Sequence, residues 1–170
     1  MIYQILKKAY YETYLSIPNK LKIPALLLFL ISAILFIPSY SYENELFSIN
    51  ATVFSFIAEY PFGETMYFTW LNDEISNEII TTLYIVSGII LAFSKEKIED
   101  EFIQSIRFKA LVQSTYFTYA ITLICVFFTY GIPFFSVVTL LIFVNLLILN
   151  TFYYTKLFIY KKQFSYENED

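Results

Sequence analysis

The chain has 170 residues, of which 58% are hydrophobic, 21% aromatic and only 15% charged, with a formal net charge of −4. A soluble domain is about half apolar and a quarter charged, so this excess of apolar side chains indicates a membrane protein. An acidic chain without a basic patch is not expected to bind nucleic acid, and the complete absence of histidine removes the commonest general base and metal ligand.

No catalytic, cofactor-binding or metal-binding residue is predicted. The sequence has no Ser–His pair, HExxH motif, Gly-rich phosphate loop or CxxC pair. The single cysteine, Cys125, lies inside an apolar run, and paired carboxylates occur only between such runs, where water would leave their pKa values ordinary. We therefore expect a protein that is not an enzyme.

Residues 1–22 are predicted to form a cytoplasmic helix that lies in the membrane interface. Apolar residues recur on one helical face of this segment, while Lys7 and Lys8 lie off that face. This pattern is typical of a helix in the headgroup region, where lysine also meets anionic lipid.

Four apolar runs follow within a predicted membrane domain, residues 23–155. A helix needs about 20 residues to cross the hydrocarbon core, and each run is that long or nearly so. We expect an all-α integral membrane protein, with spans at about 23–37, 79–93, 111–130 and 133–154. Only Gly131 and Ile132 separate the last two runs, which predicts a tight helical hairpin with Pro133 in the first turn of the returning helix.

The charges orient these runs. The eleven Lys and Arg residues lie before the first run, between the second and third, and after the fourth, whereas loop 38–78 has seven acidic residues and no basic one. Basic residues near span ends mark the cytoplasmic side. Loop 94–110, the tail 156–170 and both termini are therefore predicted to be cytoplasmic, with loop 38–78 outside.

The outer loop 38–78 is rich in aromatic residues. Amphipathic rings settle at membrane interfaces, so Tyr67, Phe68 and Trp70 are expected to lie against the outer one. Pro61 to Gly63 predict a turn. No helix or strand is predicted in this loop.

Small and polar side chains interrupt the apolar runs. They are Gly88, Ala92, Thr115, Thr118, Thr122, Asn145 and Asn150. Either helix packing or a permeation path would use such residues. Packing is favoured because no ionisable residue lies in the middle of a run, and transporters ordinarily use such residues. Asn145 points away from the other polar residues of its run, so we expect its partner to come from another subunit.

The charged segment FSKEKIEDEFIQSIRFKAL, residues 93–111, joins the second and third runs. Its apolar residues Ile98, Phe102 and Ile106 recur at helical spacing, which predicts that the third helix begins in the cytoplasm near Ile98. Ser94 is the expected N-cap, and the acidic residues beside it suit a helix N-terminus.

The same segment carries a family resemblance. GIILAFSKEKIEDEFIQSIRFKAL, preceded by WLNDEI, resembles small four-span membrane proteins of Bacteroidota, which show a similar FSKEKxEDExIxxxR segment between their second and third spans. The resemblance covers about residues 68–130 and implies a four-span fold in a bacterial inner membrane but no particular activity. Genes of that family often lie beside helix-turn-helix regulators, which hints at signalling or stress response. The motif singles out Lys95, Lys97, Glu99, Asp100, Glu101 and Arg107.

Two roles are open for these motif residues. They could form a cytoplasmic docking face for a partner, or a polar collar that closes the inner end of the helices, with Arg107 held by Glu99 or Glu101. The expected function is that of a non-catalytic membrane protein acting through contacts, as a homo-oligomer or as a small subunit of a membrane or sensory assembly. The alternative is an oligomeric channel or minor transporter lined by the threonines of the third run.

Overall fold

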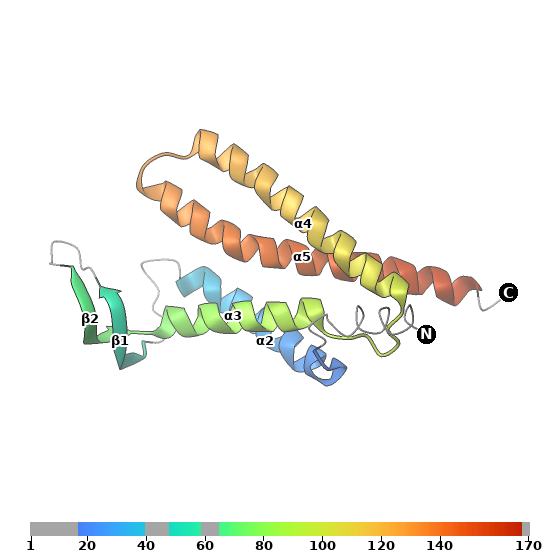
Figure 1. Cartoon of the computed structure of the whole chain (residues 1–170), viewed down its shortest axis with the longest axis horizontal. Helices are drawn as coiled ribbons and strands as arrows, with labels where there is room; N and C mark the ends of the chain where they lie inside the picture. The colour runs from blue at the N-terminus through green and yellow to red at the C-terminus, as the bar shows by residue number, and fades with distance from the viewer. Residues whose placement is uncertain (1–16, 40–47, 59–64, 168–170) are drawn as a thin grey trace, which may run out of the picture. The chain divides into compact units, whose positions relative to one another are not determined.

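The computed structural model describes residues 17–39, 48–58 and 65–167, which are mainly helical (Figure 1). In chain order the elements are a 3-10 helix η1 (Asn19–Leu21), α2 (Lys22–Ser39), β1 (Asn50–Ala58), β2 (Met66–Glu74), α3 (Ser76–Phe93), α4 (Glu101–Phe128) and α5 (Ile132–Glu167). The chain divides into two compact units, one of Leu28–Tyr84 and one of Met1–Leu27 with Ile85–Asp170.

Three of the described helices are long and apolar enough to cross a membrane. They are Ser76–Phe93, Glu101–Phe128 and, within α5, Pro133–Gln163. This agrees with a helical membrane protein, although the described residues provide three candidate spans where four were expected. The first expected span corresponds to α2, an 18-residue helix. The expected interfacial helix, residues 1–22, falls mostly on residues 1–16, outside the described residues; its last residues form the single turn of η1 and the start of α2.

The third helix begins later than predicted, and its cap is a different residue. α4 starts at Glu101 rather than near Ile98, and the Asp100 carboxylate accepts a hydrogen bond from the backbone N–H of Ile103 at 2.7 Å. The backbone N–H and hydroxyl of Ser94 instead donate to the carbonyl of Ile90 at the end of α3. A carboxylate also interacts favourably with the positive end of the helix dipole, so Asp100 is the better cap.

The last helix is longer than predicted. α5 has 36 residues and continues beyond Tyr154 through most of what was expected to be the tail 156–170. At 1.5 Å per residue it is about 54 Å long, while the hydrocarbon core of a bilayer is about 30 Å thick. No Gly or Pro follows Pro133 in α5 to end the helix where its apolar residues end.

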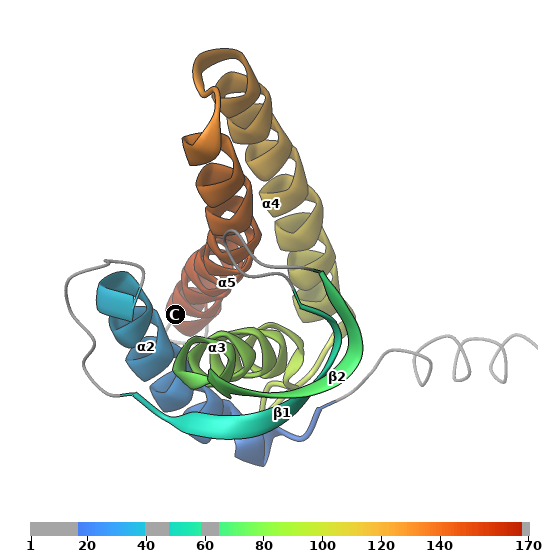
Figure 2. The ribbon, with the colours of Figure 1, turned by 90° about the vertical axis from the view of Figure 1, so that its left-hand side faces the viewer.

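The predicted hairpin of the last two helices is confirmed: α4 and α5 lie side by side and antiparallel, joined by a short turn (Figures 1 and 2). Gly131 adopts φ +73°, in the left-handed region. The N–H of Thr129 donates to the carbonyl of Cys125 at 2.9 Å, and the N–H of Phe134 donates to that of Gly131 at 3.1 Å. These bonds end α4 and begin α5 within a few residues.

The loop between the first two runs contains a β-hairpin that was not predicted. β1 and β2 pair antiparallel, in a register running from Asn50 opposite Glu74 to Ala58 opposite Met66. The turn expected at Pro61–Gly63 lies outside the described residues. In β1 half-buried and exposed residues alternate from Ala51 to Phe56, as expected for a strand whose two faces differ in burial.

Two hydrogen bonds hold the base of this hairpin at the start of α3. The N–H of Ile75 donates to the carbonyl of Ile49, and the N–H of Ile49 donates to the Ser76 hydroxyl, both at 2.9 Å. In the same unit the rings of Phe29 and Tyr84, from α2 and α3, have centroids 4.7 Å apart.

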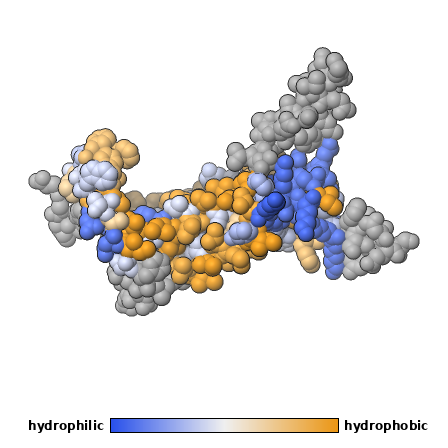
Figure 3. Space-filling model, turned by 90° about the horizontal axis from the view of Figure 1, so that it is seen from below, coloured by the Kyte–Doolittle hydropathy of each residue, from blue (hydrophilic) through white to orange (hydrophobic). Residues whose placement is uncertain are grey.

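The main core of the other unit is built from α3, α4 and α5. Its buried side chains are Ala92, Ile103, Ile106, Ala110, Leu149, Tyr153 and Leu157. These positions lie beside the charged segment between α3 and α4, whose surroundings include the hydrophilic residues coloured blue towards the right of Figure 3. The charged segment is therefore next to the buried core of this unit.

Candidate functional site

Residues 94–100 connect α3 to α4 and hold the chain that leads into α2. Ile17 forms a parallel bridge with Ser94, and its carbonyl accepts a hydrogen bond from the N–H of Lys95 at 2.9 Å. The side-chain amide of Asn19 donates to the carbonyl of Lys95 at 2.6 Å. These contacts bring the start of α2 beside the end of α3.

Glu96 is the centre of the site, although its side chain is only 5% exposed. Its carboxylate forms an ion pair with Lys22, accepts a bond from Lys161 Nζ at 2.9 Å and accepts another from the Tyr153 hydroxyl at 3.3 Å. Burial by itself would raise the pKa of Glu96, but the hydrogen bonds and charges of the two lysines outweigh burial and lower that pKa below its usual value. The carboxylate is therefore ionised at neutral pH.

Arg107 forms the second part of the site. Its guanidinium donates to Glu99 Oε1 at 2.8 Å, to the Ser94 carbonyl at 3.0 Å and to the Tyr153 hydroxyl at 3.2 Å. The other oxygen of Glu99 accepts the N–H of Glu96 at 2.7 Å. Of the two carboxylates expected to hold this arginine, the structure therefore pairs it with Glu99.

Tyr153 joins these two ion pairs. It is fully buried, accepts a hydrogen bond from Arg107 and donates one to Glu96, and its ring centroid lies 5.2 Å from the guanidinium carbon of Arg107. We call this arrangement the charge network and define it as the side chains of Lys22, Glu96, Glu99, Arg107, Tyr153 and Lys161.

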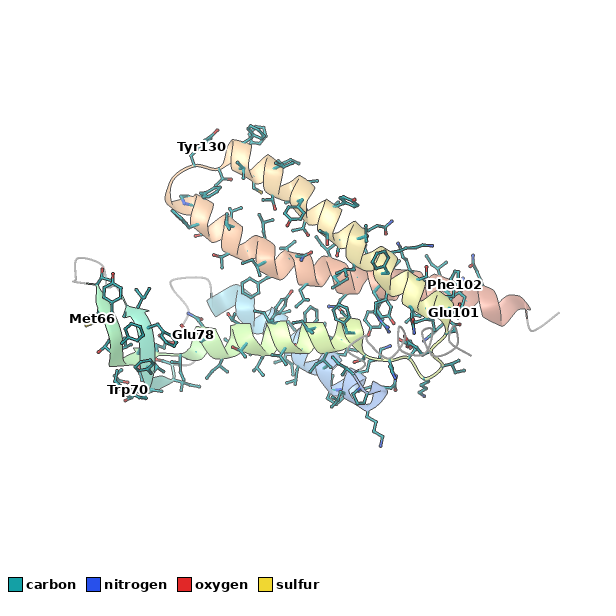
Figure 4. All side chains as sticks on the ribbon, in the orientation of Figure 1. Met66, Trp70, Glu78, Glu101, Phe102 and Tyr130 are labelled. Atoms are coloured by element: carbon teal, nitrogen blue, oxygen red, sulfur yellow. The ribbon has the colours of Figure 1, made fainter. Side chains whose placement is uncertain are left out.

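Asp100 is occupied on both oxygens. Besides capping α4, it accepts a hydrogen bond from the Tyr160 hydroxyl at 3.0 Å. The ring of Tyr160 stacks on Phe102, with centroids 4.6 Å apart. Figure 4 labels Phe102 and Glu101 at the start of α4, where this stacking occurs.

The structure thus separates the motif residues into two groups. Glu99, Asp100 and Arg107 are half-buried and form the hydrogen bonds given above, and the side chains of Lys95, Lys97 and Glu101 are exposed.

Sequence reasoning missed Glu96, the most buried of the charged residues in this segment. Its burial depends on Tyr153 and Lys161, which lie on α5, 57 and 65 residues away. No local pattern marks it, apart from its position between Lys95 and Lys97.

The polar residues predicted to face other helices have partners within the chain. Thr118 donates its hydroxyl to Asn145 Oδ1 at 3.0 Å, from α4 to α5. The adjacent antiparallel helix thus supplies a partner for the side-chain oxygen of Asn145 within the chain. The hydroxyls of Thr115 and Thr122 donate to the backbone carbonyls of Leu111 and Thr118, both at 2.8 Å.

The small residues of α3 lie against α5. The Asn150 amide donates to the carbonyl of Gly88 at 3.2 Å and to that of Leu146 at 3.0 Å. Ala92 is fully buried in the core. The Asn150 side-chain oxygen, which is buried, has no hydrogen-bond partner among the described residues. Asn150 thus joins α5 to α3 at Gly88, and Ala92 contributes to the core of the same unit.

Within residues 17–39, 48–58 and 65–167, no group of three or more His, Cys, Asp or Glu side chains could hold a metal ion. No protein-family model, no curated protein and no solved structure matches the chain.

Proposed function

We propose that this chain is a non-catalytic integral membrane protein that acts through contacts with other membrane proteins, as a homo-oligomer or as a small subunit of a larger membrane or sensory assembly. The support comes from α4. Only 6% of its most apolar stretch is buried inside the chain, compared with 39% for α3. The surface of α4 must therefore be covered by lipid or by another protein.

Two tyrosines on α4 favour a protein cover. Tyr116 and Tyr119 lie three residues apart, hence on one helical face, and their side chains are 72% and 66% exposed. Neither hydroxyl has a hydrogen-bond partner among the described residues. Tyr119 lies near the middle of the apolar part of α4, where an unpaired hydroxyl facing lipid costs about 1–3 kcal/mol. A polar group on an adjacent chain would remove that cost.

The test places a photoreactive amino acid at position 119 and irradiates native membranes. A homo-oligomer gives adducts of twice the chain mass, and a subunit gives adducts with a second protein. Adducts with lipid alone would reject the proposal. The same residue at position 135, where exposed Phe135 needs no polar partner, is the control and should react mainly with lipid.

For the motif residues we propose the collar role. The charge network uses Glu99 and Arg107 within the chain, and the Asp100 carboxylate accepts hydrogen bonds from Tyr160 and from the N–H of Ile103 at the start of α4. Of the six motif residues, only Lys95, Lys97 and Glu101 have exposed side chains that a docking partner could contact. The resemblance of about residues 68–130 to the small four-span proteins of Bacteroidota is also part of this proposal.

We also propose four spans, including α2, with both termini cytoplasmic in a bacterial inner membrane. The support is that the charge network gathers Lys22, Arg107 and Lys161, one from each of the three basic segments. The alternative, a channel lined by threonines of α4, has no separate support, since Thr118 and Thr122 already donate within the chain. Ion flux into liposomes that is abolished by Thr118→Leu with Thr122→Leu would support the channel alternative.

A further inference from the structure

One face of the β-hairpin carries exposed aromatic rings. Phe54 and Phe56 of β1 lie beside Trp70 and Phe68 of β2, with exposed fractions from 43% for Phe54 to 70% for Trp70. Ring centroids are 5.3 Å apart for Phe54 and Trp70 and 5.8 Å for Phe56 and Phe68, in edge-to-face arrangements. We call these four side chains the aromatic face.

The opposite face of the hairpin is half-buried near its base, where it carries Val53 and Ser55 on β1 and Thr69 and Leu71 on β2. Further from the base, the paired residues Ile57 and Tyr67 are exposed on this face. A hairpin with one face in water normally turns polar side chains outward. Here the larger apolar groups point outward, and no residue of β1 or of Met66–Asn72 is charged. Such an exposed apolar patch marks a contact surface.

The backbone of β2 holds one of these rings in an uncommon conformation. Phe68 has φ +50°, in the left-handed region that bulky residues avoid. Its ring nevertheless lies against Phe56 on the aromatic face. Backbone strain of this kind is found mainly where the position of a side chain matters.

The hairpin is fixed to the end of a helix that can span a membrane. A single residue, Ile75, separates β2 from α3, and hydrogen bonds from Ile75 and Ile49 hold the base. In the unit Leu28–Tyr84 the strands run crosswise to α3, which is seen end-on in Figure 2. If α3 crosses the bilayer, the strands lie along its surface.

We propose that the aromatic face binds the headgroup region of the bilayer on the side where α3 begins, and that the hairpin is an in-plane membrane anchor. Trp and other aromatic rings are enriched at that depth because they combine an apolar body with a polarisable or polar edge. The strand residues that carry the aromatic face, Thr52 to Phe56 and Phe68 to Asn72, include no ionised group that would have to be desolvated there. The inference rests on the proposed membrane insertion of α3.

The test uses intrinsic fluorescence, because Trp70, labelled in Figure 4, is the only tryptophan in the chain. The protein is reconstituted in phosphatidylcholine vesicles containing lipid brominated near the headgroup or near the chain end. We expect emission blue-shifted from that of tryptophan in water, stronger quenching by the shallow bromines than by the deep ones, and little dependence on the protein-to-lipid ratio.

Two results would overturn the proposal. Water-like emission that iodide quenches would mean that the aromatic face is in solvent. Blue-shifted emission that bromolipids do not quench, or that changes with the protein-to-lipid ratio, would mean that a second copy or another protein covers it. Resistance to carbonate extraction is measured in parallel. If the protein resists extraction while Trp70 emission is water-like, the anchor proposal is rejected and the membrane insertion of α3 is retained.

Variants test the face as a unit. Phe56→Ser with Phe68→Ser removes two rings beside Trp70, and should weaken the lipid quenching and increase quenching by iodide. Thr69→Ser, on the half-buried face, is the matched control and should leave both unchanged. Equal quenching in the double variant and the control would contradict the proposal.

Discussion

The hydroxyl of Thr118 donates a hydrogen bond to the side-chain oxygen of Asn145 at 3.0 Å and so joins α4 to α5 within their apolar regions. Water cannot replace such a bond in hydrocarbon, yet measured couplings between helices in membranes average only about 0.6 kcal/mol, with a maximum near 1.7 kcal/mol. The bond therefore fixes how the two helices are paired more than how stable they are.

A double-mutant cycle measures this bond. Thr118→Val, Asn145→Leu and the double variant should give a coupling of about 0.6–1.7 kcal/mol in the free energy of unfolding in mixed micelles. Thr139→Val is the control, because that hydroxyl donates to its own helix backbone at Phe135. A coupling indistinguishable from zero would mean that the two side chains do not meet in the folded protein.

Glu96→Gln should destabilise the protein by about 1.5–3 kcal/mol, because bonds to a charged group are lost and Lys22 keeps its charge in a largely buried place. Since the folded-state pKa of Glu96 is lowered, its stabilisation is complete above the unfolded-state pKa of about 4.3 and is lost as the pH falls through the lower folded-state value. The difference in unfolding free energy between wild type and variant should therefore shrink on acidification in that range. A pH-independent difference would contradict this.

Arg107→Lys should cost about 1–3 kcal/mol although it preserves the charge, because a lysine ammonium cannot reach Glu99, the Ser94 carbonyl and Tyr153 together. Lys109→Gln changes an exposed side chain on the same helix and should leave the midpoint of thermal unfolding unchanged. If the two substitutions had equal effects, the planar geometry of the guanidinium would be irrelevant.

Cysteine accessibility tests the proposed orientation. In a Cys125→Ser background, Asn72→Cys should react with a membrane-impermeant maleimide added to intact cells, because residue 72 belongs to the proposed outer segment. Lys97→Cys should react only after permeabilisation. Both side chains are exposed, so access to the thiol depends on its side of the membrane. Labelling of Lys97→Cys in intact cells would reverse or reject the topology.

Gly131→Ala should destabilise the α4–α5 hairpin by about 1–2 kcal/mol through backbone strain alone, since φ is +73° and no atom lies within 4 Å of the added methyl group. Asn tolerates this conformation better, so Gly131→Asn should cost less when unfolding is followed by circular dichroism. Equal stability of the alanine variant and the wild type would show that the turn can change its conformation freely.

The apolar runs predicted much of the fold because a bilayer imposes a length on each helix, which a single sequence reveals directly. α3 and the turn at Gly131 follow the predictions within a few residues. The end of α5 was missed because hydropathy marks where a helix leaves the hydrocarbon, which is not where the helix stops. Only a breaking residue marks a stop, and none is present between Tyr154 and Glu167.

The candidate site was predicted in part. Arg107 and its carboxylate lie eight residues apart, close enough for local reasoning. The role of Glu96 was not predicted because its lysine and tyrosine partners are distant in sequence. Nothing in SKEKIED distinguishes a buried carboxylate from a solvated one. The β-hairpin was not predicted because exposed aromatic residues give a sequence pattern typical of neither a strand in a soluble protein nor a membrane span.

The charge network has a consequence for biosynthesis. Its members range from Lys22 to Lys161, so the first of them emerges from the ribosome long before the last. Until α5 has been synthesised, Glu96 has neither Tyr153 nor Lys161 beside it. A nascent chain therefore holds Glu96 with an incomplete set of partners, and the arrival of the C-terminal helix completes assembly of this end of the protein.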